Sequence, residues 1–519
     1  MIKKIYREWG KTVLLLTLLI LLGLGLRVYH LTILPIFADE AIYVRWAQVM
    51  HAESTLRFLP LSDGKQPLFM WAMIPFLKIF SDPLFAGRLL SAISGIGTMV
   101  GIFILTHLLF KSKKAALFGA FIYAVVPFAV FFDRMALVDS MLSMFGVWTF
   151  IFALISVRFL RLDMAMLGGF ALGGALLTKS PAVFYSLLVP ATIIFTKLPK
   201  GIGKISLSLI KVISFWIAMW GIGYAMFNIL RLGPNFHMLT SRNRDYVYPI
   251  SHLWENPRDP LVFYFDRAIE WLTSFGVYLL LPLGALGVVG NIKKHFREII
   301  FLLVLGFAPI IIQSEFAKVF TARYIFFTLP YFVILASSAF IIFKGNLQKY
   351  LMLIFFGFLI LSLTYDYQLL TNPEKAPLPR SERSGYLEEW TAGTGIREAA
   401  DIIRAEYNNN PKQKIVVGTE GYFGTLPDGM QLYLNDLTDI TVIGVGLDFS
   451  EVPKSLLESK EFGNKTYLVA NSSRINFHKD LSEFGLKEIA SFKKADRPLK
   501  TKDYNRYGLY DTFYLLELE

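Results

Sequence analysis

Long apolar stretches, separated by short polar segments, fill the first 365 residues of the chain. About 20 apolar residues are needed for a helix to cross the hydrocarbon core of a bilayer. The stretches lie at 12–34, 84–110, 115–132, 140–158, 164–178, 182–196, 207–230, 263–290, 299–313, 324–343 and 349–365. They predict a polytopic α-helical membrane protein with about 11 transmembrane helices. An odd number would place the two ends of the membrane domain on opposite sides.

One apolar stretch, 67–80, is too short for a crossing, and we expect an interfacial helix there. Within the longer stretches, Gly97 and Gly101 lie four residues apart, as do Gly169 and Gly173. Small residues at this spacing allow two helices to pack closely.

Basic residues gather in the loops at every second boundary, at 111–114, 158–161, 197–204, 293–297 and 344–349. This positive-inside pattern predicts a retained first span with its amino terminus in the cytoplasm of a plasma-membrane protein. The net charge of +12 is explained by these loops and by anionic lipids, and we expect no nucleic-acid partner. The chain has no cysteine, which excludes disulfides and thiolate metal ligands.

The composition changes after residue 365. Prolines and charges at 366–392 predict a linker between a membrane domain, 1–365, and a soluble α/β domain, 393–519. Apolar spacing predicts a helix at 395–407, and β-branched and aromatic runs predict strands at 414–418, 440–443, 466–469 and 512–516. The glycine-rich loop 421–429 lacks phosphate-binding patterns, so it is interpreted as a turn. With the predicted threading, this domain is extracytoplasmic.

Four polar features fall on the predicted outer side of the membrane: Asp39-Glu40, the turn Gly64–Leu68 with Lys65, the segment Arg134–Asp139, and Arg323-Tyr324. Each has a structural interpretation: an interfacial stop, a solvated lysine, a helix cap and a headgroup anchor. Ionised groups beside hydrocarbon are costly, however, and commonly mark a functional site. Their common side favours such a site.

The same residues resemble a known family. The run Phe37-Ala-Asp39-Glu40-Ala-Ile-Tyr43 resembles the acidic motif in the first outer loop of GT-C glycosyltransferases, on the branch of protein O-mannosyltransferases and aminoarabinose transferases. The run Gly64–Trp71 resembles that family's Lys-Pro-Pro-Leu-Phe-Tyr-Trp element, with Gln66 in place of the first proline. Gly87–Leu90, Arg134–Asp139, Leu177–Pro181 and Arg323-Tyr324 follow in the family's order.

The resemblance implies transfer of a sugar from a polyprenyl-phosphate donor to an extracytoplasmic acceptor, by single displacement with inversion. The outer loops 35–83 and 232–262 would form the site. The expected catalytic residues are Asp39 as general base, Glu40 orienting it or the acceptor, and Asp139 holding the sugar or the first loop. The donor phosphate would be bound by Lys65 and Arg323, with Arg242 and Arg244 as weaker candidates, while Tyr43, Arg134 and Tyr324 would position the substrates.

We predict no cofactor. Ligand type alone would allow a divalent metal at His237 and His252 with Asp245 and Glu255, but these residues lack the tight spacing of a zinc motif. The expected partners are the lipid donor, membrane lipids, and an acceptor that is a protein serine or threonine, a lipid or a glycan.

Three other functions fit the sequence less well. A transporter or lipid flippase would carry charges near span midpoints, whereas here they concentrate at span ends. An oligosaccharyltransferase would carry a Trp-Trp-Asp element, and no two tryptophans are adjacent. A membrane-anchored receptor would need far fewer spans.

Overall fold

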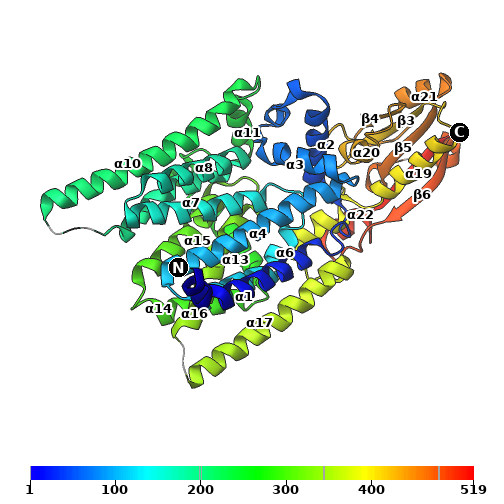
Figure 1. Cartoon of the computed structure of the whole chain (residues 1–519). Coiled ribbons are helices and arrows are strands. Elements are labelled where there is room, and N and C mark those ends of the chain that lie inside the picture. Colours follow the sequence, from blue (N-terminus) through cyan, green and yellow to red (C-terminus); the bar gives the residue numbers. More distant parts are fainter. Residues whose placement is uncertain (1, 198, 200, 343–344, 477–479) are drawn as a thin grey trace. The chain divides into compact units, whose positions relative to one another are not determined.

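The computed structural model describes residues 2–519, except 198, 200, 343, 344 and 477–479, and its contacts divide the chain into two compact units (Figure 1). The first, here called the helical unit, comprises Met1–Leu31, Thr55–Ala72 and Arg88–Pro379. The second, the sheet unit, comprises Thr32–Ser54, Met73–Gly87 and Arg380–Glu519. Each unit is described by itself.

Seven helices among the described residues are long and apolar enough to cross a bilayer. Four of them are α4 (Pro83–Phe110), α7 (Asp139–Phe159), α15 (Phe296–Phe316) and α17 (Asn346–Thr371). The other three are Glu8–Val28 within α1 (Ile2–Val28), Gly203–Leu232, which overlaps α10 (Ile202–Phe227), and Ala322–Ile342, which ends with α16 (Leu329–Ile342). Together with the comparisons below, they make the chain a multi-pass membrane protein.

The stretch predicted as a single span at 263–290 is broken into α13 (Leu261–Phe275) and α14 (Leu280–Asn291), which are bent by 99°. Between them Val277 and Tyr278 adopt positive φ angles of 47° and 61°. A left-handed backbone cannot continue a right-handed helix, so the chain turns here. If the bent pair crosses once, eight helices among the described residues could span the membrane.

Other predicted stretches fold as shorter helices. The stretch 115–132 forms α5 (Lys113–Val125) and α6 (Pro127–Phe132), and 164–178 forms α8 (Leu162–Thr178). The stretch 182–196 forms a succession of short helical turns, η3 (Ser180–Ala182), α9 (Val183–Leu188) and η4 (Val189–Phe195). The predicted interfacial helix is α3 (Leu68–Ile79). The number of crossings stays a prediction.

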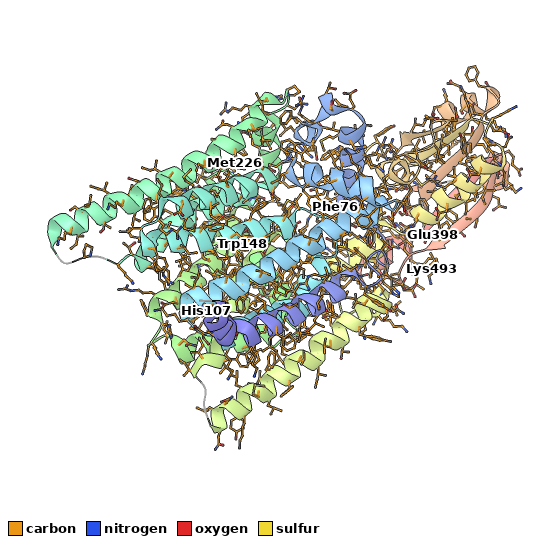
Figure 2. All side chains as sticks on the ribbon, viewed as in Figure 1. Phe76, His107, Trp148, Met226, Glu398 and Lys493 are labelled. Atoms are coloured by element: carbon orange, nitrogen blue, oxygen red, sulfur yellow. The ribbon has the colours of Figure 1, made fainter. Side chains whose placement is uncertain are left out.

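Close helix packing occurs at both predicted glycine pairs. A Cβ atom on Gly173 of α8 would lie 2.4 Å from the sulfur of Met226 on α10. A Cβ on Gly97 of α4 would lie 2.5 Å from the sulfur of Met144 on α7, and the carbonyl of Gly97 accepts a hydrogen bond from the Trp148 indole at 3.1 Å. Figure 2 labels Met226 and Trp148 on their helices. Larger residues at these glycines would separate the helices.

Two buried arginines, Arg27 and Arg134, form ionic and hydrogen-bonded contacts at the end of α1. Arg27 pairs with Asp133 at 2.9 Å, with both side chains fully buried. Arg134 donates to four carbonyl oxygens at 2.7–3.1 Å, those of Leu26, Arg27, Tyr29 and His30. The last carbonyls of a helix have no partner within it, so Arg134 satisfies groups that burial would otherwise leave unpaired.

A five-stranded sheet forms the core of the sheet unit. Its strands are β3 (Ile415–Glu420), β4 (Ile440–Gly446), β5 (Lys465–Asn471), β6 (Leu486–Lys493) and β7 (Thr512–Leu518), in the order β4-β3-β5-β7-β6. β3 is parallel to both β4 and β5, and β7 is antiparallel to β5 and β6. The predicted helix is α19 (Ile396–Asn409), so the α/β class is confirmed.

The segment after α1 contributes to the same unit. β1 (Ile36–Phe37) pairs antiparallel with β2 (Ala392–Gly393), and α2 (Ala38–Ala52) packs against α20 (Asp428–Tyr433). The sheet unit therefore contains the segment that carries Asp39.

The segment predicted as a linker, 366–392, is largely folded. α17 continues to Thr371, and α18 (Arg380–Arg383) leads into a helical turn, η9 (Ser384–Glu388). The buried carboxylate of Glu388 pairs with Arg380 at 2.5 Å and Arg383 at 2.9 Å. Three of the charged residues in the predicted linker, Arg380, Arg383 and Glu388, therefore pair with one another.

Candidate active site

The adjacent carboxylates Asp39 and Glu40 occupy the first turn of α2. Asp39 is half-buried and lies at the start of the helix. Glu40 is fully buried and accepts a hydrogen bond from the Phe37 backbone N–H at 3.0 Å. Tyr43 is buried one turn later. Glu40 thus stabilises the turn that presents Asp39.

In the helical unit, Lys65 follows a turn that is closed by glycine. Gly64 ends η2 (Leu59–Asp63) with φ +65°, and a Cβ there would lie 2.7 Å from the Arg242 Cβ on α11 (Met238–Tyr246). Asp63 pairs with Lys65 at 3.4 Å and with Arg242 at 2.8 Å, and Arg242 also pairs with Asp245 at 2.9 Å. Only glycine lets the turn at Gly64 and α11 approach this closely.

A second ion pair joins α7 to the end of α8. Asp139 is 2% exposed, and its Oδ1 accepts a hydrogen bond from Lys179 Nζ at 2.6 Å. The Lys179 ammonium lies 4.6 Å from the centre of the Tyr324 ring, and the Arg323 guanidinium lies 5.5 Å from it. A buried carboxylate with a partner of this kind is held in one position.

The two clusters lie close to each other. Gln66 donates a hydrogen bond to the Ser180 hydroxyl at 2.9 Å, which ties the Lys65 turn to the residue after Lys179. Burial raises the pKa of Tyr246, with a further contribution from Tyr324, while Lys65 and Arg242 oppose the rise. The helical unit therefore brings together Lys65, Arg242, Asp139, Arg323 and Tyr324 from four distant parts of the sequence.

Two predicted residues have other surroundings. Arg134 donates to the carbonyls at the end of α1, which is a structural role, so we leave it out of the proposed site. Arg244 is exposed, and its backbone carbonyl accepts a hydrogen bond from Lys318 at 2.7 Å.

Lys179, Asp63 and Tyr246 belong to this site but are not among the residues predicted from the sequence. Lys179 could have been predicted, because it follows an apolar stretch and lies within the run Leu177–Pro181, which resembles the family. Asp63 and Tyr246 lie in polar loops, and pairing between distant loops leaves no local pattern.

In the loop 232–262, His252 forms local contacts. His252 Nε2 lies 2.6 Å from the Asp259 carbonyl oxygen, and its ring stacks on Tyr248 with centroids 4.2 Å apart. Across the residues described, no three or more histidines and acids are grouped to hold a metal ion.

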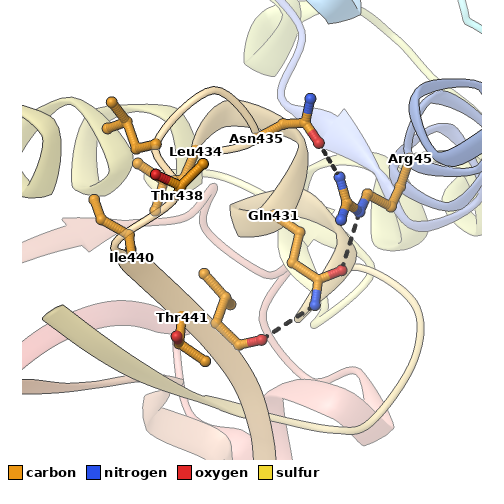
Figure 3. A pocket seen from close by; sticks show the side chains of 9 residues that line it. Arg45, Gln431, Leu434, Asn435, Thr438, Ile440 and Thr441 are labelled. Atoms are coloured by element: carbon orange, nitrogen blue, oxygen red, sulfur yellow. Dashed lines mark hydrogen bonds between the residues drawn. The ribbon is translucent and has the colours of Figure 1, made fainter. Parts of the chain in front are cut away.

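A cavity of about 310 Å³ separates part of α2 from the edge of the sheet (Figure 3). In its wall Arg45 donates to Gln431 at 3.2 Å and to Asn435 at 2.5 Å, and Gln431 donates to the Val442 carbonyl. Burial lowers the pKa of Arg45, and Asp428 opposes this. These contacts hold α2, with Asp39, against α20.

Solved structures share this fold. ArnT from Cupriavidus metallidurans bound to undecaprenyl phosphate is 14% identical and matches 98% of this chain and 98% of its own, with a TM-score of 0.57. The apo form of the same protein is 13% identical, with a TM-score of 0.56 over 98% of each chain. AglB from Archaeoglobus fulgidus, in complex with an inhibitory peptide and a dolichol-phosphate, is 13% identical over 90% of this chain and 70% of its own, with a TM-score of 0.50.

These matches define the class: the chain has the fold of the GT-C glycosyltransferases. Residues 64–221 match the family model of the dolichyl-phosphate-mannose-protein mannosyltransferases, which covers the Lys65 turn, Asp139 and Lys179. No curated protein matches the chain in sequence. The comparisons give no support to a transporter.

Lys179→Met should destabilise the protein, because it leaves the Asp139 carboxylate buried without its partner. The loss should be roughly 3–5 kcal/mol. Adding Asp139→Asn should restore much of it, since a neutral amide costs less to bury. Thermal unfolding in detergent measures this, with Lys114→Met on the exposed end of α5 as the matched control. Equal stability of the single and double variants would contradict the pairing.

Proposed function

We propose that the protein transfers a sugar from a polyprenyl-phosphate donor to a hydroxyl-bearing acceptor on the extracytoplasmic side of the membrane. The observation that carries the proposal is the cluster of Lys65 and Arg242 around Asp63, in a chain that shares its fold with a protein solved with undecaprenyl phosphate. Asp63 holds the Lys65 ammonium and the Arg242 guanidinium side by side, and Asp245 also pairs with Arg242. Charged N–H donors of both kinds can bind a phosphate.

The reaction assigned to these residues is a single displacement at the anomeric carbon. The acceptor oxygen forms the new glycosidic bond, and its proton passes to the Asp39 carboxylate. The bond between the anomeric carbon and the phosphate oxygen breaks, and its electron pair stays on that oxygen. The anomeric configuration inverts, and polyprenyl phosphate leaves. Glu40 contributes by holding the first turn of α2.

Cations stabilise the charge that develops on the departing phosphate. We assign this role to Lys65 and Arg323, with Arg242 and Arg244 in support. Lys179 fixes Asp139 and lies against Tyr324, so these three residues would shape the wall that receives the sugar. Tyr43 would position the acceptor from α2.

Lys65→Ala should weaken use of the donor, because one charge-assisted contact to phosphate is lost. Such a contact contributes roughly 1.5–3 kcal/mol, or about 10- to 100-fold in apparent donor affinity. Lys65→Arg should restore part of it, because a guanidinium places its donors differently. The measurement is consumption of radiolabelled polyprenyl-phosphate sugars in nanodiscs, with Lys114→Ala as the control. A change in acceptor affinity alone would remove Lys65 from the donor site.

The orientation can be tested because the natural chain has no cysteine. Asn243→Cys on exposed α11 should react with an impermeant maleimide in intact cells. Lys349→Cys, at the start of α17 and equally exposed, should react only after the membrane is permeabilised. The reverse pattern would overturn the positive-inside threading and, with it, the extracytoplasmic reaction.

A further inference from the structure

A cavity lies at the carboxyl ends of the parallel strands of the sheet unit. The chain passes from β3 to β4 on one side of β3 and then to β5 on the other side, so the loops after β3 and β5 diverge. In open sheets with parallel strands, ligands bind in the crevice at such a switch point. The cavity of about 190 Å³ is lined there by Trp390, Glu420, Tyr422, Phe423, Leu447 and Arg474, among others.

Its walls combine exposed aromatic rings with charged groups. Trp390, Tyr422 and Phe423 are 42%, 68% and 48% exposed. Aromatic side chains gathered in contact with water are typical of a surface that binds a partner. The Arg474 guanidinium lies 5.9 Å from the centre of the Trp390 ring, so a charged hydrogen-bond donor lies beside one of the aromatic side chains.

The cavity is also lined by a hydrogen-bond acceptor that is held in place, the Glu420 carboxylate. Glu420, at the end of β3, is 6% exposed, and its two carboxylate oxygens accept from the Asn471 backbone N–H at 2.7 Å and side-chain amide at 2.6 Å. Behind it, burial lowers the pKa of Lys494 to about 8, although Asp511 and Glu420 oppose this. Hydrogen bonds of this kind hold the carboxylate in place before a ligand arrives.

The loop that bears two of the rings is also held in place. The Gly421 N–H donates to the Gly446 carbonyl at 2.6 Å, and the Gly424 N–H donates to Asp428 at 2.8 Å. A Cβ on Gly444 would lie 2.2 Å from the Gly421 carbonyl oxygen. The loop therefore lies directly on β4, and the cavity is preformed.

The same wall adjoins the start of α2. The Ala38 N–H donates to the Thr391 carbonyl at 3.1 Å, so Asp39 and Trp390 each lie one residue from a direct backbone contact. On the following turns of α2, the Tyr43 ring lies 6.2 Å from Trp46, and Trp46 lies 5.8 Å from Phe423. Both connections lie within the sheet unit.

We propose that this cavity binds one sugar residue of the acceptor, so that the acceptor is a carbohydrate. The C–H face of a sugar ring packs on aromatic side chains, while its hydroxyls donate to Glu420 and accept from Arg474. The cavity is smaller than the pockets of about 300–1,000 Å³ that hold drug-sized ligands, which suits a single ring. This inference rests on the proposed function, because it names the acceptor for the base on α2.

The test uses the full-length protein in nanodiscs and a panel of methyl glycosides of common hexoses and pentoses as probes, with binding followed by saturation-transfer NMR and titration. At least one glycoside should bind the wild type. Trp390→Ala should weaken that binding about tenfold or more, which corresponds to roughly 1.4 kcal/mol. Glu420→Gln keeps the shape of the side chain but replaces one carboxylate oxygen by an NH₂ group. It should therefore weaken glycoside binding as well.

Phe462→Ala is the matched control, because Phe462 is 85% exposed in the same unit and does not line the cavity. The elution profile and thermal transition of each variant establish that it is folded. Hydrolysis of donor without acceptor should be unchanged in Phe462→Ala. A wild type that binds glycosides but fails to consume any donor would contradict the proposed function and leave the sugar site standing.

Three results would overturn the inference. The first is that the wild type binds no glycoside. The second is that neither Trp390→Ala nor Glu420→Gln weakens glycoside binding. The third is that these two variants lose binding to a serine- and threonine-rich peptide while their glycoside binding is unchanged. The last would assign the cavity to a protein acceptor.

Discussion

Burial of charge among apolar helices is the constraint on which the rest of this structure depends. Arg27 and Asp133 are both fully buried and pair at 2.9 Å. Arg134 donates to carbonyls in the last turn of α1 and in the two residues that follow α1. Removing one partner of such a pair costs roughly 3–5 kcal/mol, because the other charge stays out of water. These contacts fix the point at which the chain leaves α1 and continues toward Asp39.

The same constraint organises the candidate site in the helical unit. Asp139 has a lysine partner, whereas Asp63 serves two cations, Lys65 and Arg242. Arg242 also pairs with Asp245, so these side chains are held in place by several ion pairs. Lys65 and Arg242, together with Arg323 near Tyr324, are the cations that we assign to the lipid-phosphate leaving group.

The sequence predicted most of the architecture because bilayer thickness imposes a length on every crossing helix. It also predicted the parallel strands, which are apolar. It missed β6, where Lys487, Glu488 and Lys493 interrupt the apolar pattern of an edge strand. The bend between α13 and α14 was missed too, since two non-glycine residues adopt positive φ there without a sequence signal.

Of the site, the sequence predicted the residue types but not their pairings. The sequence predicted that Arg134 contacts the substrate, whereas its guanidinium donates hydrogen bonds to the carbonyls at the end of α1. It named Asp139 without its partner Lys179, because a contact 40 residues apart depends on how α7 and α8 pack. It also treated residues 421–429 as a turn, although the neighbours of that loop, Trp390 and Arg474, make it the wall of a cavity.

The central claim is that Asp39 is the base of a sugar transfer. Single-turnover transfer from a radiolabelled polyprenyl-phosphate sugar to acceptors in whole membranes tests it most directly, in Asp39→Asn and in the matched Glu40→Gln. Asp39→Asn should retain donor binding and lose about 10²–10⁴-fold in the rate of transfer. Glu40→Gln should lose far less, because a glutamine oxygen can still accept the Phe37 N–H. Transfer by Asp39→Asn at the wild-type rate would contradict the account.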